Sequence, residues 1–340
     1  MNVVFDGNYL FHKTLSVFRS YDKDKTIEEL FSTKENRQMF IRKVATEFCF
    51  ALKRFPIVST VTFVFDKTSW RKKFYKAYKN APTDKPKEDR TLFIQELFKF
   101  AERLKARGFS VIHSEGLEGD DVLFLVRNYF NTLQLPCTII SGDRDISQLV
   151  DDQVTLFCNN SKDLRLFVRA LEENQTMCED ALIDSLSEGM DLKDLKIMHT
   201  WPKQIVLQKT ILGDSGDNVP NLVKGFGEKT LEKYMDTLME AWVDNDISNQ
   251  DLSEIIWNVL KEDKKFSVLE NPIESIKTNM TLVRLHSDSF VEAYQSGALS
   301  EEETDALLSL IESGVANIIS GYSYSEAFDM QTVLNLPFKK

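Results

Sequence analysis

The sequence predicts an α/β fold, in which a parallel twisted sheet with helices on both faces is followed by a mainly helical domain. Short β-rich segments alternate with helical patterns in the first half of the chain, and the β pattern fades after about residue 175. This alternation is typical of a parallel sheet, because a crossover helix must return the chain between parallel strands. We therefore expect one domain at residues 1–175 and a second at 176–340.

The expected elements follow one another along the first domain. Runs rich in β-branched and aromatic residues predict four strands, at 3–5, 61–65, 110–113 and 138–141. Apolar residues at helical spacing predict three helices, at 35–55, 91–107 and 120–133. A further strand and a hairpin are expected at 154–158 and 164–168, on either side of a break at 159–161.

Composition excludes several classes of protein. The 340 residues are 42% hydrophobic, which is enough to bury a core, and no apolar run approaches the roughly 20 residues that a membrane span requires. The N-terminus has no secretory leader, so we expect a cytoplasmic protein without membrane contact. Four widely spaced cysteines and four histidines without metal-ligand spacing argue against a zinc site or a disulfide framework.

A basic segment interrupts an acidic chain. The net charge of −11 is unexpected for a protein that binds nucleic acid, because phosphate contacts require Lys and Arg. Residues 70–90, however, carry a local balance of +5, with aromatic residues interleaved. The basic residues are Arg71, Lys72, Lys73, Lys76, Lys79, Lys85, Lys87 and Arg90. Such a mixture fits phosphate contact and base stacking, and a solvated amphipathic helix is the alternative.

Carboxylates follow four of the predicted strands, at the point where each strand ends. Ligands bind open α/β sheets outside these strand ends, so we expect the side chains to share one crevice. The acids are Asp6, Asp66, Glu118, Asp120, Asp121, Asp143 and Asp145. One such acid alone is more often a helix cap, but a close cluster would repel itself unless cations neutralised it. Oxygen-only ligands suit Mg²⁺ or Mn²⁺.

A glycine-rich segment of the second domain adds two acids and a hairpin. Asp214 and Asp217 are three residues apart, which puts them on one face of a helical turn within reach of the same crevice. The Gly-Phe-Gly sequence that follows predicts a tight hairpin whose backbone N–H groups can approach a phosphate. The residues expected at the phosphate are Gly225, Phe226, Gly227, Lys229 and Thr230. A plain helix cap and turn is the alternative for the hairpin alone.

In order and spacing, these motifs resemble the flap endonuclease or 5′-nuclease family over roughly residues 2–235. The resemblance rests on Val-Phe-Asp6-Gly-Asn, Phe-Val-Phe-Asp66, Tyr78-Lys79, Glu118-Gly-Asp-Asp121, Ser-Gly-Asp143-Arg-Asp145 and Gly213-Asp-Ser-Gly-Asp-Asn218-Val-Pro. It implies a PIN-like sheet and a metal-dependent structure-specific 5′ nuclease. Residues 70–79 and 275–283 are most similar to the T-even bacteriophage members, ribonucleases H that remove RNA primers, which suggests a phage origin and the host cytoplasm.

The resemblance implies a mechanism with two Mg²⁺ (or Mn²⁺) ions about 4 Å apart. The first ion is expected among Asp6, Asp66, Asp120 and Asp143, with Glu118 and Asp121 in contact with it or with its ligands. Asp145, Asp214 and Asp217 would serve the second ion. Asp6 and Asp143 are thus expected to be catalytic, and Lys79 and Arg71 are expected to stabilise charge developing on the phosphate.

The basic segment corresponds to the family's helical arch, at about residues 68–90. Its nucleic-acid contacts are expected from Lys72, Lys73, Lys76, Tyr78, Lys85 and Lys87. The family often has an Arg three residues after the arch lysine. Here that position is Pro82, and Lys76, Lys85 or Lys87 is expected to replace the missing cation.

The predicted hairpin resembles the family's helix-hairpin-helix element, at about residues 205–235. That element grips duplex backbone without reading bases and often recruits K⁺. Substituting Lys229 is therefore expected to weaken affinity more than turnover, with a steep salt dependence. The implied substrates are branched or nicked duplex DNA, 5′ flaps and RNA–DNA hybrids. The C-terminal helices after about residue 245 offer a place for a sliding clamp or a single-strand binding protein, and a monomer is expected.

Two other functions stay open from the sequence. A PIN-type ribonuclease shares the sheet and the acid cluster, but such domains usually lack the hairpin and the basic arch. A catalytically silent DNA-binding replication protein would have lost its acids, yet every expected acidic position is filled.

Overall fold

The structure is a computed structural model. It describes residues 2–21, 23–52, 55, 58–80, 89–151, 153–159, 165–169, 202–244, 246–302, 304–305 and 309, and only the backbone of 158–159 and 165–169. The predicted arch positions Pro82, Lys85 and Lys87 lie outside the described residues, as does the predicted domain boundary near residue 175.

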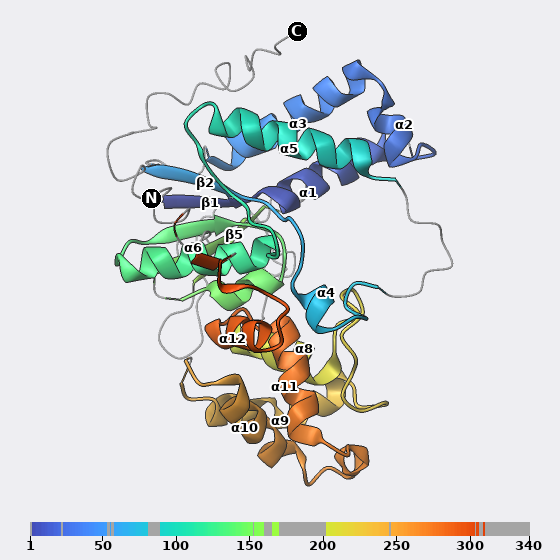
Figure 1. Cartoon of the computed structure of the whole chain (residues 1–340), viewed down its shortest axis with the longest axis vertical. Helices are drawn as coiled ribbons and strands as arrows, with labels where there is room; N and C mark the ends of the chain where they lie inside the picture. Colours follow the sequence, from blue (N-terminus) through green and yellow to red (C-terminus); the bar gives the residue numbers. More distant parts are fainter. Residues whose placement is uncertain are drawn as a thin grey trace, which may run out of the picture.

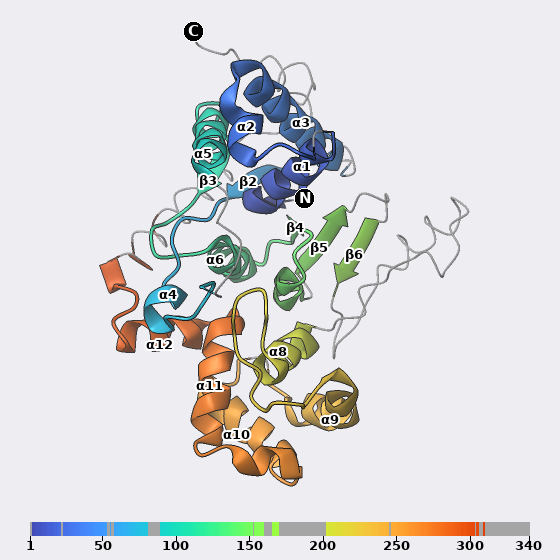
Figure 2. The ribbon, with the colours of Figure 1, turned by 90° about the vertical axis from the view of Figure 1, so that its right-hand side faces the viewer.

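A six-stranded sheet forms the centre of the first lobe (Figures 1 and 2). Its strands are β1 (Asn2–Asp6), β2 (Thr60–Val64), β3 (Ser110–Ile112), β4 (Cys137–Ile140), β5 (Val154–Asn159) and β6 (Arg165–Arg169). They lie in the order β3-β2-β1-β4-β5-β6, the first five parallel and β6 antiparallel to β5. Phe5 aligns with Phe63 and with Ile140, so the residues that follow these three strands emerge at one edge.

Helices cover both faces of the sheet. In β1, Val3 and Phe5 face an aromatic-rich core, whereas Val4 faces a second one. The first core is closed by α1 (Gly7–Ser20), α2 (Ile27–Ser32), α3 (Lys34–Leu52) and α5 (Thr91–Lys105). The second is closed by α6 (Gly119–Thr132), the 3₁₀ helix η1 (Asp145–Leu149) and α12 (Ser287–Gln295). This alternation follows from the two-residue period of a strand.

The second lobe is helical and has its own apolar core (Figure 2). It contains α8 (Pro202–Leu212), α9 (Glu228–Ala241), α10 (Asn249–Leu260), the 3₁₀ helix η2 (Lys264–Val268) and α11 (Pro272–Val283). The short helix α4 (Arg71–Phe74) lies between the two lobes in Figure 1.

Polar contacts join the end of α11 to the first lobe. The Gln148 side chain donates a hydrogen bond to Val283 O (3.0 Å) and accepts one from Leu285 N (3.0 Å). Arg71 Nε donates to Leu282 O at 2.8 Å. A side-chain amide that pairs with both a backbone donor and a backbone acceptor reproduces the strand pattern of hydrogen bonds, so it holds the two segments in one register.

The predicted fold class is confirmed, and the strands and helices expected in the first lobe form within a few residues of their expected ends. Helices α1 and α2 were not expected. Asp6 begins α1, because its carboxylate caps the helix by accepting from Tyr9 N at 2.8 Å. Among the described residues, no helix is both long enough and apolar enough to cross a bilayer.

Candidate active site

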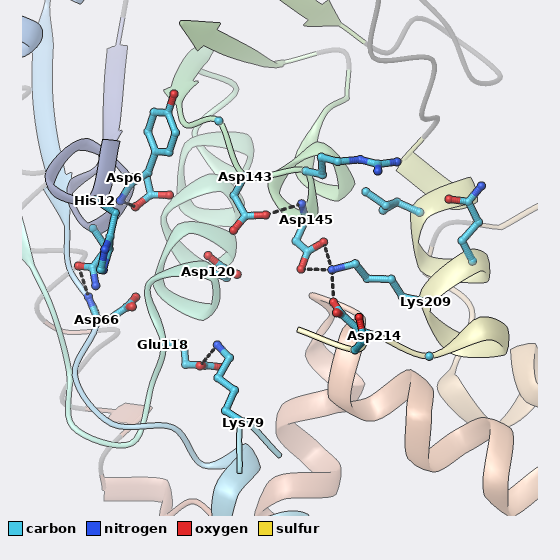
Figure 3. A pocket seen from close by; sticks show the side chains of 18 of the residues that line it. Asp6, His12, Asp66, Lys79, Glu118, Asp120, Asp143, Asp145, Lys209 and Asp214 are labelled. Carbon is cyan, nitrogen blue, oxygen red and sulfur yellow. Dashed lines mark hydrogen bonds and ion pairs between the residues drawn. The ribbon is translucent and has the colours of Figure 1, made fainter. Parts of the chain in front are cut away.

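A cavity of about 850 Å³ opens between the sheet edge and the helical lobe. Carboxylates dominate its lining, and Figure 3 shows that they come from strand ends, from α6 and from the loop after α8. Seven of the nine predicted acids line it: Asp6, Asp66, Glu118, Asp120, Asp143, Asp145 and Asp214. Residues far apart in the sequence thus converge as the strand ends require.

The ends of β1 and β4 place two of these acids through a shared hydroxyl. Ser141 Oγ donates to Asp6 Oδ2 at 2.7 Å and accepts from Asp143 N at 3.1 Å. Asp143 Oδ1 in turn accepts from Asp145 N at 3.0 Å, which forms a local turn. The Ser141 hydroxyl therefore positions the Asp6 carboxylate, and the backbone of Asp145 positions the Asp143 carboxylate.

Asp66 is held against the first turn of α6. Gly119 N donates to Asp66 Oδ1 at 2.5 Å, and Asn8 Oδ1 accepts from Asp66 N at 3.0 Å. A Cβ atom at position 119 would lie 2.5 Å from that same carboxylate oxygen, so only glycine allows the approach. Gly119, the second residue of the Glu-Gly-Asp-Asp motif, thus makes room for the carboxylate of Asp66, which follows β2.

The cavity disfavours negative charge. Burial, with the neighbouring Asp66 and Asp143 charges, raises the pKa of Asp6 to about 7. Burial and then the Asp143, Asp6 and Asp66 charges raise the pKa of Asp120 well above its usual value. The pKa values of Asp66 and Asp145 are also raised, chiefly by burial. Carboxylates kept ionised here at neutral pH require compensating positive charge.

The donor set fits divalent cations. The carboxylates around Asp120 offer hard oxygen ligands, which Mg²⁺ and Mn²⁺ prefer. One oxygen from each of Asp145, Asp214 and Asp217 lies within 4.8 Å of the others. Both Asp145 oxygens face the Lys209 ammonium, which pairs with Oδ1 and donates to Oδ2. These carboxylate oxygens are already close to a cation, as the ligands of a metal ion must be.

We expect these raised pKa values to give the metal-free protein an unusual pH dependence. The folded state holds protons that the unfolded chain releases near pH 4, so stability falls as the pH rises from about 4 to about 7. The lowered pKa values of Glu118 and Asp214 act in the opposite sense, but only below their usual values of 4.5 and 3.8. In EDTA, urea unfolding should therefore give a free energy that is roughly 1–4 kcal/mol lower at pH 8 than at pH 5.

The variant Asp120→Asn should reduce this difference and raise the stability at pH 8, because it removes one of the mutually repelling charges. Asp236→Asn, on the exposed surface of α9, serves as the control and should change neither value. Equal stability at the two pH values in EDTA would contradict the electrostatic account.

Asp121 and Arg71 lie outside the cavity lining and pair with each other. Arg71 NH1 and NH2 each donate to one Asp121 oxygen at 2.8 Å, and Trp70 Nε1 donates to Asp121 Oδ2 at 3.2 Å. Asp121 is 1% exposed and Arg71 is 3% exposed. Asp121 was predicted to contact the ion or its ligands, and it accepts a hydrogen bond from Glu118 N at 3.1 Å. The burial of Arg71 differs from the phosphate contact predicted for it. The hydrogen-bonding groups of Arg71 and Asp121 are thus already paired inside the protein.

Tyr78 and Lys79 connect the base of the basic segment to two acids. The Tyr78 hydroxyl lies 3.0 Å from Glu118 Oε2 and 2.9 Å from Asp217 Oδ2, and only 3% of the residue is exposed. Lys79 Nζ donates to Glu118 Oε1 at 2.5 Å and lies 3.7 Å from Asp217. Tyr78 is thus buried rather than open to a base, whereas Lys79 lines the cavity.

Charge pairing dominates the titration of this cluster. Although burial opposes ionisation of Glu118, the nearby Arg71 and Lys79 charges lower its pKa. Burial also opposes the charge on Lys79, but Glu118 and Asp217 raise its pKa. Lys79 has a left-handed backbone with φ of +52°, and its N–H donates to Asp217 O at 2.8 Å. A non-glycine residue in that conformation needs such external support.

The loop after α8 carries the last two acids in a closed turn. Asp214 and Val219 exchange backbone hydrogen bonds of 2.9 and 2.8 Å. Gly213 has φ of +75°, and a Cβ there would lie 2.4 Å from Val219 O. Asn218 Nδ2 donates to Ala77 O at 2.7 Å, which joins this loop to the base of the basic segment. Asp217 does not line the cavity, but it contacts the Tyr78 hydroxyl and lies 3.7 Å from Lys79, which does line the cavity.

The predicted hairpin lies at the start of α9, where Glu228 reaches the cavity wall. Gly225 has φ of +83° and Gly227 caps the helix, as a tight turn requires. Phe226 is 1% exposed and packs on Phe266, so it supports the hairpin from inside. The exposed residues of this element are Gly225, Gly227, Glu228 and Lys229, with Thr230 half-buried. Lys72, Lys73 and Lys76 are also exposed.

Several cavity residues were not anticipated from the sequence. Lys209 lies between Asp145 and Asp214, and His12, Tyr9, Gln208, Arg144 and Glu228 complete parts of the wall. The one feature of the sequence that could have indicated Lys209 as a cavity residue is its position five residues before Asp214. No local pattern marked His12, whose place depends on the path of α1.

Comparison with known proteins identifies the relationship. The family model described as "5'-3' exonuclease, N-terminal resolvase-like domain" matches residues 2–178. A 5'-3' exonuclease of Mycoplasma pneumoniae is 28% identical over 247 residues, 72% of each chain. DNA polymerase I of Caldicellulosiruptor bescii is 32% identical over 178 residues, which are 52% of this chain but 18% of the polymerase.

Solved structures agree on the fold. The T5 D15 protein, co-crystallised with metal ions, superposes with a TM-score of 0.56 at 17% identity, covering 93% of this chain and 99% of that one. A T5 5'-exonuclease with bound zinc gives a TM-score of 0.52 at 17% identity over 92% and 99%. The family match, which spans more than half of the chain and includes all four acid-bearing strand ends, leads to one conclusion: this chain belongs to the 5'-3' exonuclease family.

Proposed function

We propose that the chain is a metal-dependent, structure-specific 5′ nuclease that hydrolyses phosphodiester bonds as a 5′ to 3′ exonuclease, a flap endonuclease or both. The observation that carries this proposal is the convergence of seven of the predicted carboxylates in one cavity, with raised pKa values for Asp6, Asp66, Asp120 and Asp145. Such an arrangement is costly for stability, which is typical of a functional site.

The proposed ion ligands fall into two groups. Asp6, Asp66, Asp120 and Asp143, with Glu118 beside them, would hold one ion, and Asp145, Asp214 and Asp217 would hold the other. When bound, Mg²⁺ or Mn²⁺ ions supply charge stabilisation at the phosphate and an acidified water as nucleophile. Asp121 is better assigned to positioning, because its oxygens already accept from Arg71, Trp70 and Glu118 N.

The other residues proposed to act in catalysis or binding are basic side chains. Lys79, 38% exposed and aimed into the cavity, is proposed to orient the scissile phosphate and stabilise its charge. Arg71 is proposed to act through Asp121 and Glu118 rather than on the substrate. Exposed Lys72, Lys73 and Lys76 remain candidates for backbone contacts.

The substrates we propose are branched or nicked duplex DNA, 5′ flaps and RNA–DNA hybrids, including the RNA primers of replication. The hairpin at 225–230, with exposed Lys229, would hold duplex backbone away from the cut, and K⁺ is proposed there. A sliding clamp or a single-strand binding protein as partner, a monomeric state and a phage origin are likewise proposals.

One assay tests the function. We expect 5′-flap, nicked and RNA-primed duplexes to be cut near the junction or the 5′ end in Mg²⁺ and to remain intact in EDTA. Cleavage of single-stranded RNA in preference to these duplexes would favour a PIN-type ribonuclease. Tight duplex binding without any metal-dependent cleavage would favour a silent DNA-binding protein.

A further inference from the structure

Lys209 lies on the last turn of α8, between two acids that come from different lobes (Figure 3). Its Nζ is 2.5 Å from Asp145 Oδ2 and 2.5 Å from Asp214 Oδ2. All three side chains are largely buried, with 23%, 20% and 19% exposed respectively. A single ammonium thus bridges the sheet lobe and the helical lobe at the acid cluster.

The bridging ammonium occupies the ligands of the proposed second ion. Asp145 and Asp214 are two of the three acids whose oxygens lie within 4.8 Å of one another. A divalent ion binds carboxylate oxygens at about 2.0–2.6 Å, and the Lys209 ammonium already lies 2.5 Å from one oxygen of each acid. The two cations compete for these oxygens, because both are neutralised by the same two carboxylates and their like charges repel at short range.

The geometry points to Lys209 as a displaceable counter-cation that sets the affinity of the second ion site. Its ammonium holds Asp145 and Asp214 together until a divalent ion displaces it. Because the ion must displace the ammonium in order to bind, the second site has a lower affinity for the ion than it would have without Lys209. The inference rests on the proposed function, since it concerns an ion that the function requires. It assigns Lys209 a positioning role, not a contact with the reacting phosphate.

Lys79, another lysine of the cavity, approaches the second-site acids less closely than Lys209 does. Its ammonium pairs most closely with Glu118, at 2.5 Å, and lies 3.7 Å from Asp217. Lys209 instead contacts both Asp145 and Asp214 directly. A flexible four-carbon side chain beside an open cavity of about 850 Å³ has room to withdraw when an ion arrives.

Calorimetric titration of the full chain with Mn²⁺ tests the inference without any measurement of activity. The variants are Lys209→Met, which removes the charge at similar volume, and Lys209→Gln, which serves if the first fails to fold. We expect the wild type to bind two ions, and the weaker site to bind about tenfold more tightly in either variant, with the stronger site unchanged. Lys209→Arg should keep the wild-type affinities, because it keeps the charge.

Lys13→Met provides the matched control, since Lys13 makes a comparable 2.8 Å ion pair with Glu47 but does not line the acidic cavity. It should leave both Mn²⁺ affinities unchanged. Unchanged or weakened second-site binding in both uncharged Lys209 variants would overturn the inference. So would a wild type that binds one ion and still cuts DNA, because Lys209 would then replace the second ion permanently. A chain that neither binds Mn²⁺ nor cuts DNA would instead refute the proposed function itself.

Discussion

Replacing Asp143 by asparagine is expected to lower the single-turnover rate of 5′-flap cleavage about 10³-fold. Asparagine keeps the side-chain oxygen that accepts from Asp145 N, so the local turn is preserved and the backbone need not move. The change removes only the negative charge of one proposed ion ligand. Quenched-flow cleavage in Mg²⁺ measures the rate, and binding of the same flap in Ca²⁺ measures affinity.

Affinity for the flap should change less than about threefold, because phosphate contacts elsewhere supply most of the binding. Asp236→Asn, which removes an exposed charge on α9, is the control for net charge and should cleave normally. An Asp143→Asn protein that cleaves within tenfold of the wild type would contradict a ligand role for this residue.

The variant Arg71→Met is expected to lose about 3–5 kcal/mol of unfolding free energy. It leaves the Asp121 carboxylate, 1% exposed, without its bidentate partner, and it removes the hydrogen bond to Leu282 O. Urea unfolding in EDTA at pH 7 measures the loss. The Asp121→Leu/Arg71→Met double variant should regain part of it, because no unpaired charge is then buried.

Lys72→Met is the matched control, since Lys72 is the exposed neighbour of Arg71 on α4 and should change stability by less than about 0.5 kcal/mol. If Arg71 instead contacted phosphate, as its sequence context predicted, Arg71→Met would weaken cleavage and leave stability unchanged. That result would contradict the buried ion pair.

The sheet was predictable because its information is local. Each strand is a short run of apolar residues, and each acid of the cavity stands directly after such a run or at the start of the next helix, as Asp6 and Asp66 do. Parallel strands then bring these positions to one edge without further knowledge of the fold. A different local pattern, the three-residue spacing of Asp214 and Asp217, predicted that Asp214 reaches the cavity.

The roles of Arg71 and Tyr78 were not predictable in this way. Both stand in a basic segment whose other cations are exposed, and nothing nearby in the sequence distinguishes them. Their burial is decided by partners 50 and 139 residues away, Asp121 and Asp217. Lys209 is a similar case, because its ion pair with Asp145 spans 64 residues. Local patterns predict where charge lies, but not which charges neutralise one another.

The Gln148 contacts with Val283 O and Leu285 N have a geometric consequence for substrate choice. Gln148 stands three residues after Asp145, and α11 belongs to the same packed core as the hairpin that starts α9. Duplex held at that hairpin would therefore lie at a constant separation from the carboxylates. Where the strand is cut would follow from the length of duplex between these two points, so the enzyme would select junctions by shape and not by base sequence.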